Sequence, residues 1–203
     1  MAAPRPNSHS PVLIALAVWL ALALAVGFDE TLARIPKPIP QLILYGLTAM
    51  VLVVSKQVPL VRSWLDQLDL RWLAGVHLTR FAGGYFLVLY GEGKLPFGFA
   101  VPAGITAMSV AAGNLILMSL PPERRHFRTV WMIWNIFGLA NIVFMVVIGA
   151  IFGVTRHEAM EPIAELPFSL FPTFLIPLIV GSHFELIHRL RAQKTKPEDA
   201  LEP

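Results

Sequence analysis

Six long apolar stretches are the feature that most constrains how this chain can fold. They cover residues 11–28, 39–55, 71–90, 95–119, 130–153 and 168–190. Each is close to the ~20 residues that an α-helix needs to cross the hydrocarbon core of a bilayer. A helix satisfies its own backbone hydrogen bonds, as lipid requires. The sequence therefore predicts an all-α, polytopic transmembrane helix bundle with six spans. We expect a single transmembrane domain over residues 1–190 and a polar cytoplasmic tail over residues 191–203.

The overall composition agrees with a membrane location. Hydrophobic residues make up 56% of the 203 residues and charged residues only 14%, whereas roughly 25% are charged in soluble domains. This balance argues against a soluble enzyme, a nucleic-acid-binding module and a disordered chain, because each needs more polar surface. The chain has no cysteine, so disulfides and thiolate metal sites are excluded. We expect the lipid bilayer as the main partner and no nucleic acid.

Lysine and arginine are distributed unevenly between the two sides of the predicted bundle. Eleven lie in the terminal tails or in the loops after the second and fourth stretches: Arg5, Lys56, Arg62, Arg71, Arg124, Arg125, Arg128, Arg189, Arg191, Lys194 and Lys196. Four lie in the other loops, namely Arg34, Lys37, Lys94 and Arg156. Cytoplasmic loops carry the excess of basic residues, so both termini are predicted to be cytoplasmic.

Two segments near the N-terminus have alternative interpretations. The first stretch, residues 11–28, could be a cleaved signal peptide, but its 18 apolar residues exceed the usual 7–15 and favour a retained helix. Residues 59–69 place Val61, Trp64 and Leu65 on one helical face. This pattern indicates an amphipathic helix at the cytoplasmic surface, acting as a connector or, alternatively, as a lipid-sensing element.

Small residues and prolines mark the fourth and sixth stretches. Ala100 and Gly104 are four residues apart, a spacing that lets helix backbones approach closely. Pro102 is expected to kink or open the fourth helix, and Pro172 and Pro177 are expected to bend the sixth. The fourth stretch is therefore either a central packing helix or a broken helix that lines a ligand site. The sixth is either a bent packing helix or a hinge.

Arg80 is the most informative single residue. It lies about 13 Å into the third stretch at 1.5 Å per residue, where an arginine costs at least ~2.5–3.5 kcal/mol on insertion scales. Facing the bundle interior and finding hydrogen-bond acceptors would relieve that cost. His77 and Gly84 are three residues before and four residues after Arg80, so an α-helix would place all three on one face.

Other polar residues fall at similar depths in the cytoplasmic half of the bundle. We predict one intramembrane polar cluster, and its members are His77, Arg80, Asn114, Asn135, Asn141, His183 and Glu185. Glu185 is the one acidic residue within the six stretches, so it is a candidate partner of Arg80, directly or through an asparagine or water. The cluster is either a ligand-binding site, as intramembrane ionisable groups suggest, or a hydrogen-bonded network that fixes helix register.

His77 and His183 suggest an alternative cofactor. Each lies six residues inward from a basic residue, Arg71 and Arg189 respectively, so the two imidazoles are expected at equal depth. That arrangement could provide axial ligands to a b-type haem, with an arginine near a propionate. No other metal motif is present, and no nucleophile–base constellation can be assembled. We therefore predict no cofactor, with haem b as the alternative. The sequence disfavours an enzyme but does not decide the question.

Several motifs between Arg80 and the fifth stretch resemble those of a known group of proteins. RFAGGYF, KLPFGFAVPAG and WNIFGLAN are similar to motifs in a family of small, uncharacterised bacterial membrane proteins. The matching residues are Arg80, Leu95–Pro96, Pro102–Ala103–Gly104 and Trp134–Asn135. The resemblance implies a bacterial inner-membrane protein and no particular activity. Relatives carry acidic residues near positions where this chain has Thr106 and Asn141, which weakens a proton-coupled interpretation.

Together these features predict a multi-pass protein of the bacterial inner membrane. Our main hypothesis is binding or transport of a small molecule or ion through the polar cluster. The alternatives are a haem- or quinone-associated redox subunit and a structural or accessory subunit. A homo-oligomer or a larger membrane complex is compatible with each of these.

Overall fold

The computed structural model describes residues 9–120 and 126–192, and this part of the chain is all α, with no strand. In the first third of the chain the elements are α1 (His9–Phe28), α2 (Thr31–Arg34), α3 (Ile39–Gln57) and α4 (Pro59–Gln67). They are followed by α5 (Leu70–Gly75), the 3₁₀-helix η1 (Val76–Gly83), α6 (Gly84–Gly91) and α7 (Phe97–Ser119). The last are α8 (Phe127–Thr155), the 3₁₀-helix η2 (His157–Ala164), the π-helix η3 (Phe171–Leu175) and α9 (Ile176–Ala192). Arg5, Arg124, Arg125, Lys194, Lys196 and most of the predicted tail lie outside the described residues.

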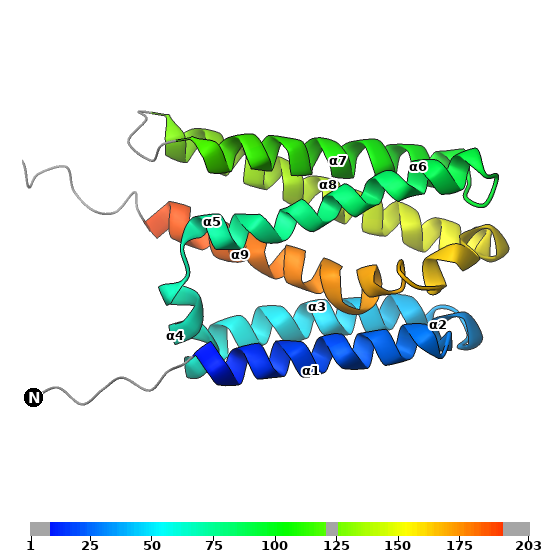
Figure 1. Ribbon diagram of the computed structural model, residues 1–203, viewed down its shortest axis with the longest axis horizontal. Helices are drawn as coiled ribbons and strands as arrows, with labels where there is room; N and C mark the ends of the chain where they lie inside the picture. The colour runs from blue at the N-terminus through cyan, green and yellow to red at the C-terminus, as the bar shows by residue number, and fades with distance from the viewer. Residues whose placement is uncertain (1–8, 121–125, 193–203) are drawn as a thin grey trace, which may run out of the picture. The chain divides into compact units, whose positions relative to one another are not determined.

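The chain divides into two compact units. Unit 1 comprises Met1–Asp69 and Ala150–Gly181, and unit 2 comprises Leu70–Gly149 and Ser182–Pro203. Unit 1 therefore contains α1 to α4, η2, η3 and the start of α9, whereas unit 2 contains α5, η1, α6, α7, most of α8 and the end of α9 (Figure 1). A single transmembrane domain over residues 1–190 stays a prediction.

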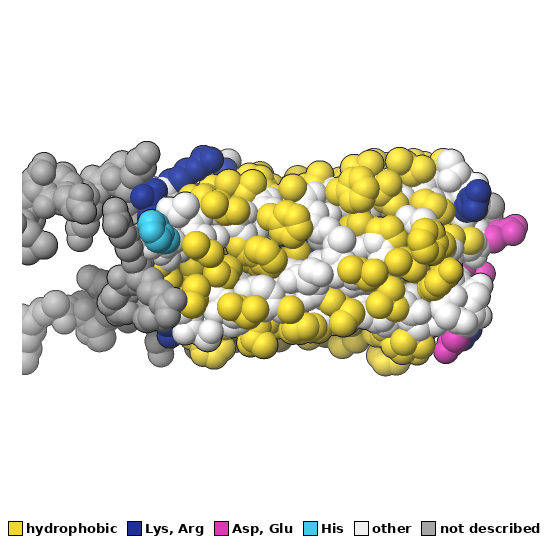
Figure 2. Space-filling model, turned by 90° about the horizontal axis from the view of Figure 1, so that it is seen from above, with side chains coloured by type: hydrophobic (Ala, Val, Ile, Leu, Met, Phe, Trp, Pro, Cys, Tyr) yellow, Lys and Arg dark blue, Asp and Glu magenta, His cyan; other side chains and the backbone are white. Residues whose placement is uncertain are grey.

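Five helical segments are long and apolar enough to cross a membrane. They are Pro11–Phe28, Ile39–Gln57, Phe97–Ser119, Phe127–Thr155 and Phe171–Ala192. Their exposed side chains are largely hydrophobic, and Figure 2 shows one face on which hydrophobic side chains cover the middle while charged ones gather near the ends. A soluble protein rarely exposes so extensive an apolar surface. The described chain thus has the helices and the surface of an integral membrane protein.

The third apolar stretch differs from its prediction, because it is not one α-helix. Residues Leu70–Gly91 form α5, η1 and α6 in direct succession, with the 3₁₀ segment Val76–Gly83 in the middle. Gly75, Gly83 and Gly84 at the junctions all keep right-handed helical dihedrals, so the three elements continue one another. With three residues per turn, a 3₁₀-helix superposes residues i and i+3. Gly83, rather than the predicted Gly84, is therefore buried on the face of His77 and Arg80.

Close backbone approach explains the small residues of unit 2. η1 and α6 pack along α7. A Cβ atom added at Gly83 would lie 2.7 Å from the Cβ of Ala107, and one added at Gly104 would lie 2.8 Å from the Leu87 side chain. α7 starts at Phe97 and continues through Pro102 without interruption, so the expected opening at this proline is absent. The structure thus favours the packing role for this helix over a broken helix.

The prolines of the last stretch accompany a change of helix type in its N-terminal half, within unit 1. Pro172 is the second residue of the π-helix η3, and Pro177 is the second residue of α9, which follows it. In α-helical register the N–H of residue 177 would bond to the Thr173 carbonyl, but proline has no N–H. The indole Nε1 of Trp19 on α1 donates to this carbonyl instead, at 2.9 Å. The tryptophan in the middle of the first stretch therefore satisfies a backbone group that a proline has freed.

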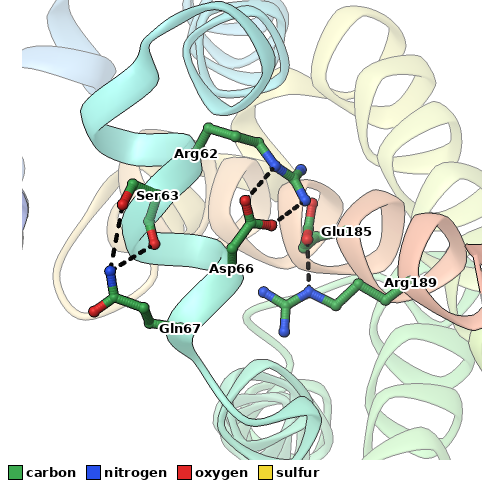
Figure 3. Close-up of polar contacts among 6 residues, drawn as sticks. All are labelled: Arg62, Ser63, Asp66, Gln67, Glu185 and Arg189. Carbon is green, nitrogen blue, oxygen red and sulfur yellow. Dashed lines mark hydrogen bonds and ion pairs between the residues drawn. The ribbon is translucent and has the colours of Figure 1, made fainter.

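The predicted amphipathic segment at residues 59–69 contains α4, and Pro59 is its first residue. Leu65 is buried, while Arg62 forms an ion pair with Asp66 one turn later, at 2.5 Å. Gln67 donates to the Ser63 carbonyl on the same helix (Figure 3). One apolar face and one charged face are what an interfacial helix requires.

Candidate functional site

All seven residues of the predicted polar cluster belong to unit 2. His77 and Arg80 lie on η1, Asn114 on α7, Asn135 and Asn141 on α8, and His183 and Glu185 on α9. His77 and His183 are each only 2% exposed and Arg80 is 3% exposed. Burying so many polar groups within one apolar unit is costly unless they bond to one another. The following contacts show which of them do.

Two histidines form the centre of the cluster. The imidazole rings of His77 and His183 lie with their centroids 4.1 Å apart and their planes tilted by 50°. Nε2 of His77 is 3.1 Å from the hydroxyl of Ser182 on α9. These contacts bring η1 and α9 together within unit 2.

Asn135 fixes the orientation of His183. Its Nδ2 donates to the backbone carbonyl of His183 at 3.0 Å, which leaves its Oδ1 to face Nδ1 of the same histidine at 2.7 Å. An amide oxygen can only accept, so Nδ1 of His183 carries the proton and donates. In the neutral imidazole, Nε2 is then an acceptor, and this buried nitrogen has no hydrogen-bond partner. A Cβ atom added at Gly138 on α8 would lie 2.8 Å from Cε1 of this ring, so a glycine is required there.

Arg80 uses neutral acceptors on α8. Its Nη1 donates to the carbonyl of Gly138 at 3.1 Å, and its Nη2 donates to Oδ1 of Asn141. Nε is buried without a partner. Among the described residues, no aspartate or glutamate forms an ion pair with Arg80. The guanidinium is thus anchored to α8, but its charge has no carboxylate to balance it.

Glu185 lies apart from this arrangement. Its Oε1 accepts from Nε of Arg189 one turn later on α9, at 2.7 Å (Figure 3). The expectation that Glu185 is a partner of Arg80 therefore gives way to an Arg80–Asn141 pair. An asparagine can bond to the guanidinium without being a charged group that lipid penalises.

Asn114 connects the cluster to α5. Its Nδ2 donates to the carbonyl of Ala74 at 2.5 Å. Asn114 also lines a small cavity whose other walls are His77, Val110, Leu117, Trp131, Trp134, Asn135, His183 and Leu186. The space open to the centre of a water molecule is about 10 Å³, which is close to what one water needs.

The cavity wall carries hydrogen-bonding groups without protein partners. Nε1 of Trp131, Nε1 of Trp134 and Nδ1 of His77 are buried and make no hydrogen bond within the described chain. Trp134 lies against Gly113, where an added Cβ atom would come within 2.1 Å of its ring. Buried polar groups are nearly always satisfied by protein, water or ligand. With Nε2 of His183, four residues that line one cavity carry unpaired nitrogens, and together they point to an occupant.

The geometry also tests the haem alternative. Axial imidazoles bind iron from opposite faces of the macrocycle, whereas the rings of His77 and His183 touch each other. This arrangement does not fit a haem held by both histidines. Within the described residues, no group of three or more His, Asp or Glu side chains could hold a metal ion.

Sequence reasoning missed Ser182 as a member of the cluster. It lies next to His183 in an apolar stretch, and that adjacency is a signal that could have drawn attention to it. Trp131 and Trp134 share an arc of α8 with Asn135, but their indole nitrogens could not be placed at a cavity from the helical period alone.

One comparison with known proteins gave a match. The sequence model of a family described as a domain of unknown function (DUF8737) matches residues 38–191. No curated protein and no solved structure matches the chain. The matched range includes all seven residues of the polar cluster. It agrees with the expected resemblance to an uncharacterised family.

Proposed function

Because the chain belongs to the family of the domain of unknown function DUF8737, its role has to be inferred from its own residues, and we propose that it binds or transports a small molecule or ion in the membrane. The observation that carries this proposal is the cavity of unit 2, with its unpaired nitrogens on Trp131, Trp134 and His77. A network that served only to fix helix register would have no reason to leave these groups unpaired.

The proposed topology has six spans with both termini in the cytoplasm of a bacterial inner membrane. α5, η1 and α6 together form the third span, and their combined length is about 37 Å at 1.5 Å per α-helical and 2.0 Å per 3₁₀ residue. That length is sufficient for a hydrocarbon core of about 30 Å. The asymmetry of eleven against four basic residues sets the orientation.

Single cysteines test this topology, since the chain has none of its own. Cysteines in residues 29–38, 91–94 and 154–167 should react with a membrane-impermeant thiol reagent added outside intact cells. A cysteine at Ser63 should react only after the membrane is opened. Labelling of Ser63→Cys from outside would reject both the orientation and the six-span arrangement.

A matched pair of variants on α7 tests the binding proposal. Leu117 lines the cavity, whereas the adjacent Ile116 is 64% exposed. Leu117→Phe should fill the cavity, and Ile116→Phe should leave it open while adding the same side chain. Gently purified wild type and both variants would be analysed by mass spectrometry for small species that co-purify.

We expect a small species that wild type and Ile116→Phe retain and Leu117→Phe loses. A panel of simple salts and metabolites, added back to stripped protein, should raise the melting temperature of the first two proteins only, because a ligand that binds the native state stabilises it. The proposal would fail if the three proteins retained the same species and none responded to any member of the panel.

A further inference from the structure

The start of α8 and the end of α9 meet within unit 2, and each contributes an arginine. Arg128, in the first turn of α8, is half-buried, and its Nε donates to the backbone carbonyl of Leu190 on α9 at 2.6 Å. This carbonyl belongs to the peptide group that joins Leu190 to the exposed Arg191. Arg128 is therefore anchored to the same piece of backbone that carries Arg191.

The described part of unit 2 offers no counter-charge for these two arginines. Its acidic residues are Glu92 and Glu185. Both are already paired, Glu92 with Lys94 at 2.7 Å and Glu185 with Arg189 at 2.7 Å. The ion pairs of the described chain include neither of the two arginines. Their positive charge is therefore available to an anion from outside the protein.

The free donor groups of the two arginines suit an anion with several oxygen atoms. A guanidinium has five N–H groups, and Arg128 uses the one on Nε, while no described residue bonds to its two Nη atoms. Arg191 makes no hydrogen bond or ion pair with any described residue. The planar fork of a guanidinium matches the oxygen atoms of a phosphate group. A phosphate is thus the anion that this pair of side chains fits.

Both arginines lie at the ends of membrane-length helices. Arg128 is the second residue of the apolar segment Phe127–Thr155, and Arg191 is the last but one of the segment Phe171–Ala192. The 29 residues of α8 extend about 43 Å at 1.5 Å per residue. A bilayer is about 40–45 Å thick with its headgroup regions and about 30 Å without them. The ends of α8 therefore reach the level of the lipid phosphates.

The exposed face of α9 next to these arginines changes from apolar to basic. Phe184, His188 and Arg191 are four and three residues apart, so they share one face of the helix. All three are exposed, Phe184 by 41%. A phospholipid changes in the same direction, from its acyl chains to its headgroup. A lipid phosphate therefore fits this face better than a soluble phosphate, which has nothing to place against Phe184.

We propose that Arg128 and Arg191 bind the phosphate group of an anionic phospholipid, with Phe184 alongside one of its acyl chains. Arg128, held by the carbonyl of Leu190, provides a donor fork that is already oriented, and Arg191 adds the second charge. A zwitterionic lipid is disfavoured because its own cation would lie beside two arginines. None of these residues lines the cavity, so this proposal does not depend on the proposed function.

The probe is phosphatidylglycerol, added in mixed micelles to protein that has been stripped of lipid. Phosphatidylcholine is the matched lipid, because it has the same phosphodiester but carries a cation of its own. Inorganic phosphate without lipid is the third addition. The melting temperature is read from the fraction that stays monodisperse after heating. Phosphatidylglycerol should raise it in a saturable way, and the other two should have a much smaller effect at equal concentrations.

Substitutions of the arginines test whether this effect is local. Arg191→Gln should raise the half-saturating concentration of phosphatidylglycerol about fivefold, as expected for one basic residue near an anionic lipid surface. Arg128→Gln should raise it about tenfold or more, because hydrogen bonds to a charged group are lost. Arg128→Lys keeps the charge without the fork and should lie between wild type and Arg128→Gln. Lys56→Gln, at an exposed lysine of unit 1, removes the same charge elsewhere and should bind like wild type.

If Arg128→Gln does not fold without its bond to Leu190, Arg191→Gln decides, because Arg191 is exposed and bonds to no described residue. Three results would overturn the proposal. Equal stabilisation by the two lipids would leave only apolar contact. Stabilisation by inorganic phosphate as large as that by phosphatidylglycerol would assign the arginines to a soluble anion. An unchanged affinity in Arg191→Gln, or an equal loss in Lys56→Gln, would reduce the effect to the overall surface charge.

Discussion

Replacing Trp19 by phenylalanine should destabilise the protein only while Pro177 is present. In unit 1 the indole Nε1 donates to the Thr173 carbonyl at 2.9 Å, and its ring packs edge-on against Phe174 with centroids 4.9 Å apart. Trp19→Phe keeps an aromatic ring but removes the donor. Pro177→Ala returns an N–H to the position that bonds to the Thr173 carbonyl in an α-helix. The second change should therefore make the first one harmless.

The magnitude follows from the cost of one hydrogen bond inside a membrane protein. A net contribution of about 0.5–1.5 kcal/mol is usual, and double-mutant cycles in a membrane helix bundle average about 0.6 kcal/mol with a maximum near 1.7. The smaller ring costs some packing as well, but that loss occurs in both backgrounds and cancels in the cycle. We expect a coupling energy of about 1 kcal/mol between positions 19 and 177. For a chain of this size it corresponds to roughly 2–4 °C in melting temperature.

The assay compares wild type, Trp19→Phe, Pro177→Ala and the double variant in one detergent. Melting temperatures are read from the monodisperse fraction after heating. Trp19→Phe should lose about 2–4 °C or more when Pro177 is present and clearly less when it is combined with Pro177→Ala. Trp72→Phe, at an exposed site, should melt like wild type. Equal losses in both backgrounds would show that the tryptophan contributes only its ring, and the account of the freed carbonyl would be wrong.

Two further predictions concern the polar cluster of unit 2. Gly138→Ala should lower the melting temperature, because the added Cβ atom would lie 2.8 Å from Cε1 of His183. Gly46→Ala is the control and should be neutral or stabilising, because no atom lies within 4 Å of the added Cβ atom. A Gly138→Ala variant that melts like wild type would contradict the packing described. Asn141→Leu should lower the free energy of unfolding by about 1–3 kcal/mol, because it leaves an N–H group of Arg80 unpaired. Adding Arg80→Leu should recover much of this stability. Folded yield and melting temperature measure both effects.

The lengths of the apolar stretches in the sequence were enough to predict the positions of most long helices. α3 begins at Ile39, where the sequence places the start of its second stretch, and α1 ends at Phe28 as expected. Long apolar runs are reliable because lipid leaves no alternative to helix for them. The 3₁₀ character of Val76–Gly83 could not be read in the same way. An assumed period of 3.6 residues fits His77 and Arg80 almost as well as a period of three, so nothing in this short pattern separated the two.

The relative level of the two histidines along their helices was easier to predict than the rotation of each helix about its axis. His77 and His183 were expected at one level from their spacing to Arg71 and Arg189, and their rings are in contact. The same reasoning could not decide whether Arg80 would reach Glu185 or an asparagine. That choice depends on which way α8 and α9 face, and packing at Gly138 and Ser182 determines it.

The 3₁₀ segment is what allows one stretch to supply both His77 and Arg80 to the cluster. Buried residues recur at every third position from α5 to α6: Ala74, His77, Arg80, Gly83, Phe86 and Leu89. With three residues per turn the histidine and the arginine lie one above the other, so His77 reaches His183 and Ser182 while Arg80 reaches α8. In an α-helix the same two positions would diverge by about 60° at 100° per residue. Arg80 would then turn away from Gly138 and Asn141, and its charge would leave the neighbourhood of the cavity. The cluster thus depends on the tighter winding of η1, because its contacts require His77 and Arg80 on one narrow face of the helix.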